Sequence, residues 1–168
     1  EAPPGMSHAS SLTLIIGQLL EGHKLRASDL EAVAVSKGPG SYTGLRIGVS
    51  AAKGIAYGAK IPLIAVNTLT AMCSGYLDAH RERLQEDTLL CPMIDARRME
   101  VYNAVYRADG TIVRETAADI INERSFSDLL ADHPVVFFGN GSEKCRNIIT
   151  LPNATFIEGF QLSASYLH

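Results

Sequence analysis

Residues 33–66 read VAVSKGPGSYTGLRIGVSAAKGIAYGAKIPLIAV, and this stretch decides the fold. Its apolar ends, Val33–Ser36 and Pro62–Val66, predict two short buried strands. Glycine and proline in Lys37–Ser41 predict a turn, and the small and apolar residues from about Thr43 to Gly58 predict a helix. A strand, a helix and a second strand in this order favour parallel pairing through a crossover, so the stretch predicts an α/β unit.

Another helix is predicted before this unit, over residues 7–21. Ser7 can cap its amino terminus, and Gly22 stands where a helix commonly stops at a left-handed residue. Ser28 and Glu31 have the spacing of a capping box, which predicts a short helical turn. Apolar residues recur at helical spacing in this segment, namely Leu12, Ile15, Ile16, Leu19 and Leu20.

A third helix is predicted after the second strand, from Asn67 or Thr68 to about Arg83. Apolar side chains line one face of it, namely Leu69, Met72, Cys73, Tyr76 and Leu77, with Leu84 beyond. A polar connection follows at residues 84–88, and beyond it the predicted elements are mostly strands. We therefore place a boundary between two parts, residues 1–84 and residues 85–168.

The second part predicts a meander of strands at residues 89–94, 101–106 and 111–114. Asp109-Gly110 between the last two is typical of a hairpin turn. Ser125 is predicted to cap a short helix that reaches Asp132. The remaining predictions are a strand at Val135–Phe138, a helix near Glu143–Ile149 and a short strand at Thr155–Ile157.

The composition excludes several classes of protein. The 168 residues are 46% hydrophobic and 20% charged, which excludes a disordered or low-complexity chain. The apolar runs are too short to span a bilayer. A net charge of −3 does not provide the positive field expected of a protein that binds nucleic acid without a partner. The three cysteines include no CxxC pair, which fits a reducing compartment better than a disulfide framework.

The glycine-rich turn before the second helix allows two interpretations. A helix amino terminus with free N–H groups suits a phosphate. The turn is neither a Walker loop nor GxGxxG, so local spacing favours the second interpretation, a structural turn whose glycines permit tight packing and whose serine caps the helix. The residues concerned are Gly38, Pro39, Gly40, Ser41, Thr43 and Gly44.

The second helix carries an unusual number of small residues, and this also has two interpretations. Small side chains let another helix approach closely. That helix can be the chain's own first helix, or it can belong to a partner that docks on both helices together. The small and apolar positions are Gly44, Ile47, Gly48, Ala51, Ala52 and Ile55, whereas Arg46, Ser50, Lys53 and Tyr57 form a polar stripe.

The remaining candidate groups point to little chemistry. The five histidines include no HExxH motif and no pair four residues apart, so a helix-borne metal pair is not predicted. Asp95, Arg97, Arg98 and Glu100 can hold a site, but such a cluster is more often a solvated turn with weak ion pairs. Cys91 in an apolar strand is most simply a core thiol.

Four blocks of this sequence strongly resemble the TsaB (YeaZ) family. They are Lys37–Gly48 (KGPGSYTGLRIG), Gly54–Ala56 (GIA), Pro62–Leu69 (PLIAVNTL) and Ile94–Tyr102 (IDARRMEVY). The resemblance runs from about Pro4 to the end. It implies an actin-like fold, of the sugar-kinase and Hsp70 class, with two ribonuclease-H-like lobes. The family's first strands and its carboxy-terminal end are expected to be missing here.

The resemblance also implies partners and a function. Family members are subunits of the bacterial machinery that makes threonylcarbamoyladenosine next to the anticodon of tRNA. They pair with the catalytic paralogue TsaD through the first two long helices, or with themselves when TsaD is absent, and an ATPase, TsaE, completes the assembly. This implies a cytoplasmic protein without a cofactor that meets tRNA only through the complex. The implied contact residues are Leu12, Ile15, Ile16, Leu19, Gly44, Ile47, Gly48, Ala51, Ala52 and Ile55.

The same resemblance implies that this chain is not an enzyme. In TsaD, two histidines that bind a metal stand where this chain has Thr68 and Met72. Neither is a good ligand for that chemistry. Two enzymatic alternatives stay open. One is an actin-like ATPase or phosphotransferase that uses the glycine turn. The other is a peptidase, which rests only on the family's old glycoprotease label.

Overall fold

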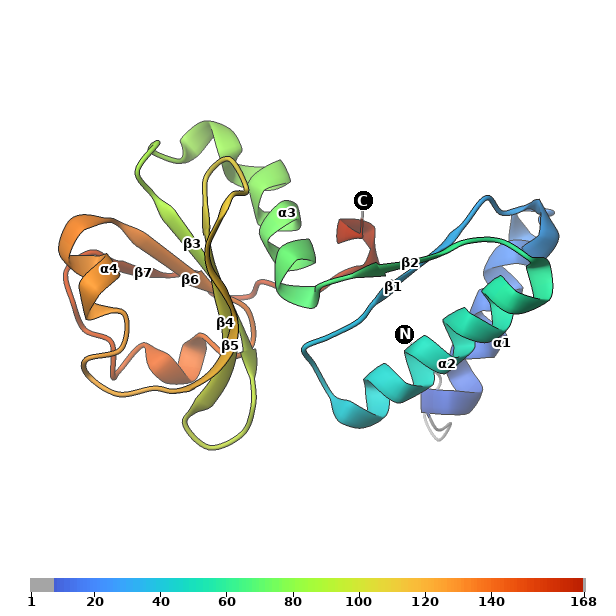
Figure 1. Cartoon of the computed structure of the whole chain (residues 1–168), viewed down its shortest axis with the longest axis horizontal. Coiled ribbons are helices and arrows are strands. Elements are labelled where there is room, and N and C mark those ends of the chain that lie inside the picture. The colour runs from blue at the N-terminus through green and yellow to red at the C-terminus, as the bar shows by residue number, and fades with distance from the viewer. Residues whose placement is uncertain (1–7, 168) are drawn as a thin grey trace. The chain divides into compact units, whose positions relative to one another are not determined.

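The computed structural model describes residues 8–167 (Figure 1). The chain divides into two compact units, of which the first ends at Asn67 and the second comprises Thr68–Tyr166. This division differs from the boundary expected at residues 84–88. The reason is that the third helix, α3 (Thr68–His80), buries its apolar face against strands of the second unit.

The first unit contains α1 (His8–Gly22), β1 (Val33–Ser36), α2 (Tyr42–Ala59) and β2 (Leu63–Val66). The two strands pair in parallel, with Val33 opposite Leu63 and Ser36 opposite Val66, which confirms the predicted α/β unit. The strands are not buried as expected, because β1 and β2 form a sheet of only two strands among the described residues. Ile64 is therefore 50% exposed.

The ends of the first elements differ in detail from the sequence predictions. Lys24, not Gly22, takes the left-handed conformation after α1, with φ of 57°. The 3-10 turn at Ala27–Asp29 is closed by the Asp29 carboxylate, which accepts a 2.8 Å hydrogen bond from the N–H of Arg26. This contact replaces the capping box expected from Ser28 and Glu31. The predicted cap Ser7 lies outside the described residues.

The second unit is a five-stranded sheet with the order β5-β4-β3-β6-β7. Strands β3 (Leu89–Asp95), β4 (Glu100–Arg107) and β5 (Ile112–Ile120) form the predicted antiparallel meander. Strands β6 (Val135–Phe138) and β7 (Ala154–Phe156) extend it in parallel with β3. Helix α4 (Ser127–Asp132) precedes β6.

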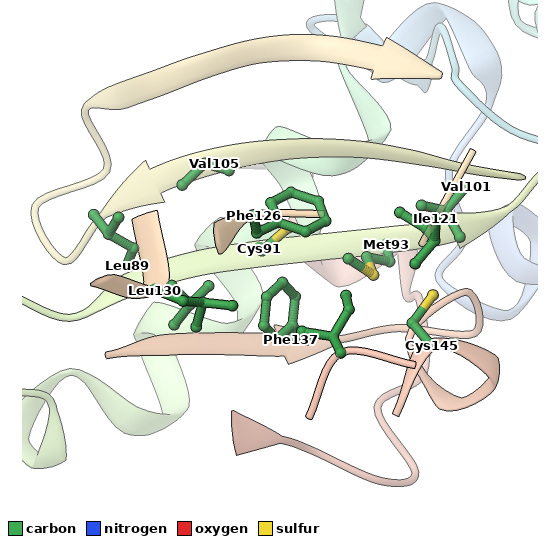
Figure 2. Packing of buried hydrophobic residues seen from close by; sticks show 12 residues of the cluster. Leu89, Cys91, Met93, Val101, Val105, Ile121, Phe126, Leu130, Phe137 and Cys145 are labelled. Carbon is green, nitrogen blue, oxygen red and sulfur yellow. The ribbon is translucent and has the colours of Figure 1, made fainter. Parts of the chain in front are cut away.

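Two core clusters cover the two faces of this sheet. One consists of α3 residues with Leu90, Ala104, Tyr106 and Phe138. The other packs alternate strand residues against Phe126, Leu130 and Cys145, as Figure 2 shows. Because both faces are covered, β3 is apolar at nearly every position instead of alternating.

Two predicted local features of the second unit are wrong. Ser125 does not cap α4; its hydroxyl accepts from the N–H of Asn122, and Phe126, with φ of 62°, stands at the cap position. Its ring is buried against Phe137, so tertiary packing sets the start of the helix. The helix expected at residues 143–149 is only a 3-10 turn, Glu143–Cys145.

The cysteines are core residues, as predicted for Cys91. Burial raises the pKa of Cys73 to about 12 and also raises the pKa of Cys91 and Cys145. At about pH 8, we expect all three thiols of the native protein to resist Ellman's reagent and to react after denaturation. A thiol that reacts at once in the native protein would contradict this packing.

Candidate functional site

The glycine turn before α2 is built around the side chain of Leu45. Gly38 has φ of 105°, and a Cβ placed there would lie 3.1 Å from Leu45 Cδ1. A Cβ on Gly40 would lie 3.8 Å from the same atom. Close packing on Leu45 and the left-handed backbone thus explain the glycine at position 38 without any ligand.

Ser41 is the amino-terminal cap of α2, as the structural interpretation of the turn predicted. Its hydroxyl accepts a 3.4 Å hydrogen bond from the N–H of Gly44. One of the free amide donors that a phosphate would need is therefore already used. The arrangement favours a structural turn over a nucleotide site.

Replacing the cap tests this assignment. We expect Ser41→Ala to lower the free energy of unfolding of the first unit by about 1 kcal/mol, because the N–H of Gly44 loses its acceptor. Ser41→Asp keeps an acceptor and should stay close to the wild type. Urea denaturation followed by circular dichroism measures both, and equal losses in the two variants would count against the capping role.

The exposed side of α1 and α2 is the other candidate site. A Cβ added at Gly48 of α2 would meet nothing within 4 Å, and the same is true of Gly54 and Gly58 on α2 and of Gly17 on α1. The described part of the chain therefore does not need these glycines for its own packing. This result weakens the interpretation in which the small residues of α2 only accommodate α1.

The predicted contact residues are spread over different degrees of burial. On α1, Ile15 is 41% and Leu19 61% exposed, whereas Leu12 and Ile16 are half-buried. On α2, Gly44 is exposed and Ala52 is buried, so Ala52 belongs to the internal packing of the unit. The other predicted positions on α2 are half-buried, namely Ile47, Gly48, Ala51 and Ile55.

The structure adds exposed apolar residues that the sequence pattern did not single out. Leu14 on α1 is 48% exposed, and Tyr42 at the start of α2 is 75% exposed. Leu14 lies outside the run of helical spacing, so only its exposure identifies it. Together with Ile15 and Leu19 it makes the outer side of α1 strongly apolar, a feature common at protein interfaces.

A hollow of about 600 Å³ adjoins this surface. Thr13 of α1 lines it together with residues of α2, and the Arg46 guanidinium lies 5.4 Å from the centre of the Tyr42 ring. The hollow thus offers hydroxyl groups, small apolar groups and a cation. Its α2 residues are Tyr42, Thr43, Arg46, Ile47, Ser50 and Ala51.

The two positions at which the resemblance implies metal ligands in TsaD, Thr68 and Met72, are buried in the second unit. Thr68 and Met72 are each 2% exposed, and Met72 packs in the cluster that contains Tyr76 and Phe138. Within residues 8–167, no group of three or more histidine, cysteine or acidic side chains is placed to hold a metal ion. None of the described helices is long and apolar enough to cross a membrane.

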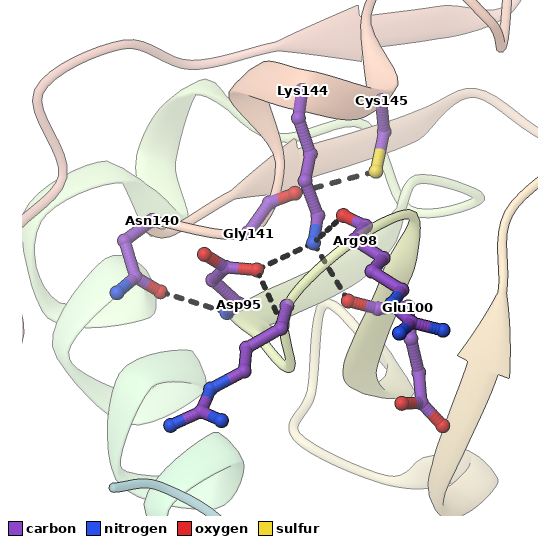
Figure 3. Close-up of polar contacts among 8 residues, drawn as sticks. Asp95, Arg98, Glu100, Asn140, Gly141, Lys144 and Cys145 are labelled. Carbon is purple, nitrogen blue, oxygen red and sulfur yellow. Dashed lines mark hydrogen bonds and ion pairs between the residues drawn. The ribbon is translucent and has the colours of Figure 1, made fainter.

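The charged cluster after β3 is more ordered than a solvated turn, because Lys144 holds it together (Figure 3). The ammonium group of Lys144 pairs with the Asp95 carboxylate and donates to the carbonyl oxygens of Arg98 and Glu100 at 2.8 and 2.7 Å. This pairing lowers the pKa of Asp95. Sequence reasoning missed Lys144, which lies 49 residues from Asp95 and carries no local signal.

Comparisons with known proteins agree on one group of relatives. The family profile of TsaD, tRNA N6-adenosine threonylcarbamoyltransferase, matches residues 5–148. The tRNA threonylcarbamoyladenosine biosynthesis protein TsaB of Bacillus subtilis is 30% identical over 146 residues, which are 85% of this chain and 61% of that protein. TsaB of Escherichia coli is 36% identical over 124 residues, which are 70% of this chain and 52% of that protein.

A solved structure shows the same relationship. YeaZ from Pseudomonas aeruginosa matches with a TM-score of 0.71 and 26% identity, over 96% of this chain and 74% of that one. The mixed α/β fold of this chain is therefore similar to that of YeaZ. The chain spans 61% and 52% of the lengths of the two TsaB relatives.

Proposed function

Because this chain belongs to the TsaB (YeaZ) family, we propose that it is a non-catalytic subunit that binds and activates TsaD during threonylcarbamoyladenosine modification of tRNA. The docking surface of the proposal is the outer side of α1 and α2. The modified nucleoside would be the adenosine next to the anticodon. The assembly would also contain the ATPase TsaE, and the chain would meet tRNA only within it.

One observation supports the docking surface most directly. The α2 helix has open space over Gly48, and the neighbouring α1 exposes Leu14, Ile15 and Leu19. Glycine in a helix interior costs about 1 kcal/mol relative to alanine. A close helix–helix contact with another molecule gives a reason for glycine where the chain itself provides none. The same surface would serve a homodimer when TsaD is absent.

The proposal also accounts for the buried Thr68 and Met72. A hydroxyl and a thioether packed in a core cannot replace a pair of histidine ligands in metal-assisted transfer. The chemistry would then be performed by TsaD alone. The described residues of this chain would provide surface and no reacting group.

The proposed architecture and location follow from the family. We propose that the two units belong to the two lobes of an actin-like fold, in which the β1–β2 pair is part of a larger sheet. A sheet of two strands is rarely stable alone, which is consistent with this idea. Because bacterial tRNA is modified in the cytoplasm, the chain would act there.

Reconstitution tests the proposal. TsaD, TsaE, threonylcarbamoyl-AMP and unmodified tRNA are incubated with and without this protein, and the modified nucleoside is measured by mass spectrometry of digested tRNA. We expect modification only when this protein is present. Full modification in its absence would refute the proposed role, and a protein that modifies tRNA without TsaD would show that it is an enzyme.

A further inference from the structure

The tip of the β3–β4 hairpin places two adjacent arginines in an unfavourable backbone conformation. Arg97 has φ of 74° and Arg98 has φ of 46°. This left-handed region costs a residue with a Cβ about 1–2 kcal/mol, and glycine adopts it freely. Arginine at both positions therefore needs a reason other than the geometry of the turn.

The rest of the unit holds this tip in place. Lys144 makes three contacts with the hairpin, one to the Asp95 carboxylate and two to backbone carbonyl oxygens. The tip is also fixed from within, because the N–H of Arg97 donates to Asp95 Oδ1 at 2.9 Å. The N–H of Asp95 donates to Asn140 Oδ1 at 3.1 Å (Figure 3). Only two of these contacts involve the arginines, and both use backbone atoms, the N–H of Arg97 and the carbonyl oxygen of Arg98, so none of the contacts requires a guanidinium group.

The two guanidinium groups are available for binding. Both arginines are exposed, and among residues 8–167 neither side chain forms a hydrogen bond or an ion pair. The Asp95 carboxylate is already paired with Lys144, which leaves the tip with an excess of positive charge. A hollow of about 530 Å³ lies beside it, lined by residues 96–100 and by Ile120, which is 74% exposed.

We propose that Arg97 and Arg98 bind phosphate groups of tRNA in the assembled complex. This inference rests on the proposed function and extends it by giving this subunit a direct RNA contact. Arginine presents a planar fork of donors that matches two phosphate oxygens, and a rigid turn presents two such forks together. With a net charge of −3, the chain as a whole does not attract RNA from a distance. The tip therefore binds tRNA only when TsaD holds the tRNA nearby.

An acidic protein segment would be the competing ligand for the same charges. The RNA ligand is favoured because phosphates are bound in pairs along a backbone, which suits adjacent arginines, and because the relatives carry the names of tRNA-modification proteins. The two ligands give different results in the experiment below.

The test uses the double variant Arg97→Gly/Arg98→Gly in the complex with TsaD. Glycine relieves the backbone strain, so the variant should be at least as stable as the wild type. We expect its complex to bind tRNA about tenfold more weakly at ~0.1 M salt, with a slope of log K against log salt smaller by about 1 to 2. The control Arg81→Ala/Arg83→Ala removes two exposed charges from another turn of the same unit and should change the affinity less than twofold.

Co-purification of each variant with TsaD is measured alongside tRNA binding. If the wild type does not assemble with TsaD, the proposed function fails, and the RNA contact falls with it. If all complexes assemble and the glycine variant binds tRNA as tightly as the wild type does, the RNA contact alone is refuted. If the glycine variant loses TsaD instead of tRNA, the tip binds protein and the inference is equally overturned.

Discussion

Gly48→Trp is expected to weaken association with TsaD at least ~100-fold while leaving the fold of the chain intact, because packed helices approach to about 8–10 Å and an indole ring fills that gap. A Cβ at this position meets nothing within 4 Å, so the new side chain leaves the helix into open space, and we expect the fold to survive. Tryptophan is also a better helix former than glycine. Sedimentation velocity measures the loss of heterodimer and homodimer, and the yield of modified tRNA should fall in parallel.

Lys53→Trp is the matched control for this variant. Lys53 is exposed on the same helix and belongs to the polar stripe, on a different side from Gly48. The Lys53→Trp variant adds an indole of the same size outside the proposed docking surface. It should therefore leave sedimentation and tRNA modification unchanged. If Gly48→Trp sediments as the wild type does, both alone and with TsaD, the docking surface is wrong. If Lys53→Trp dissociates the complex as well, the interface extends around α2.

Gly139→Ala is expected to destabilise the second unit by about 3 kcal/mol or more, since it combines backbone strain with overpacking. Gly139 follows β6 with φ of 99°. An added Cβ would collide with the carbonyl oxygen of Met93 and with Cε of Met72. The methionine side chain can move aside, but the backbone of β3 cannot do so without breaking the sheet.

Gly110→Ala separates these two causes. Gly110 has a similar φ of 90° in the β4–β5 hairpin, but a Cβ there meets nothing within 4 Å. Only the conformational cost remains, so we expect a loss of about 1 kcal/mol. Urea denaturation of both variants gives the two free energies of unfolding. Equal losses would show that the collision at Gly139 is relieved by movement and that the packing argument fails.

The local sequence pattern predicted the secondary structure of the strongly apolar segments well. Strands β1 and β6 have the predicted bounds, and α3 buries the predicted face that contains Leu69, Met72 and Tyr76. In these segments hydrophobic spacing and packing favour the same conformation. Caps were predicted less well, since Phe126, whose ring is buried, stands at the cap position of α4 in place of Ser125, and Lys24, not Gly22, takes the left-handed conformation after α1.

The candidate site was predictable only as a set of residue types. Spacing identified the small residues of α2 and the apolar residues of α1 as candidates for an interface. It left open whether the chain's own helices use that surface, and it included the buried Ala52. The hydrogen bond from Lys144 to the Arg97–Arg98 tip could not be predicted from the sequence, because contacts between residues far apart in the chain leave no periodic signal.

The amino-acid sequence by itself determined the type of most segments, the parallel strand–helix–strand unit and the family, since these depend on side chains near one another in the chain. Only the tertiary structure decided which glycines face open space, which apolar residues stay exposed, and that Lys144 reaches the hairpin tip. The physical reason is that burial and long-range hydrogen bonds depend on which distant segments pack together, whereas periodicity reports only on a segment's own conformation.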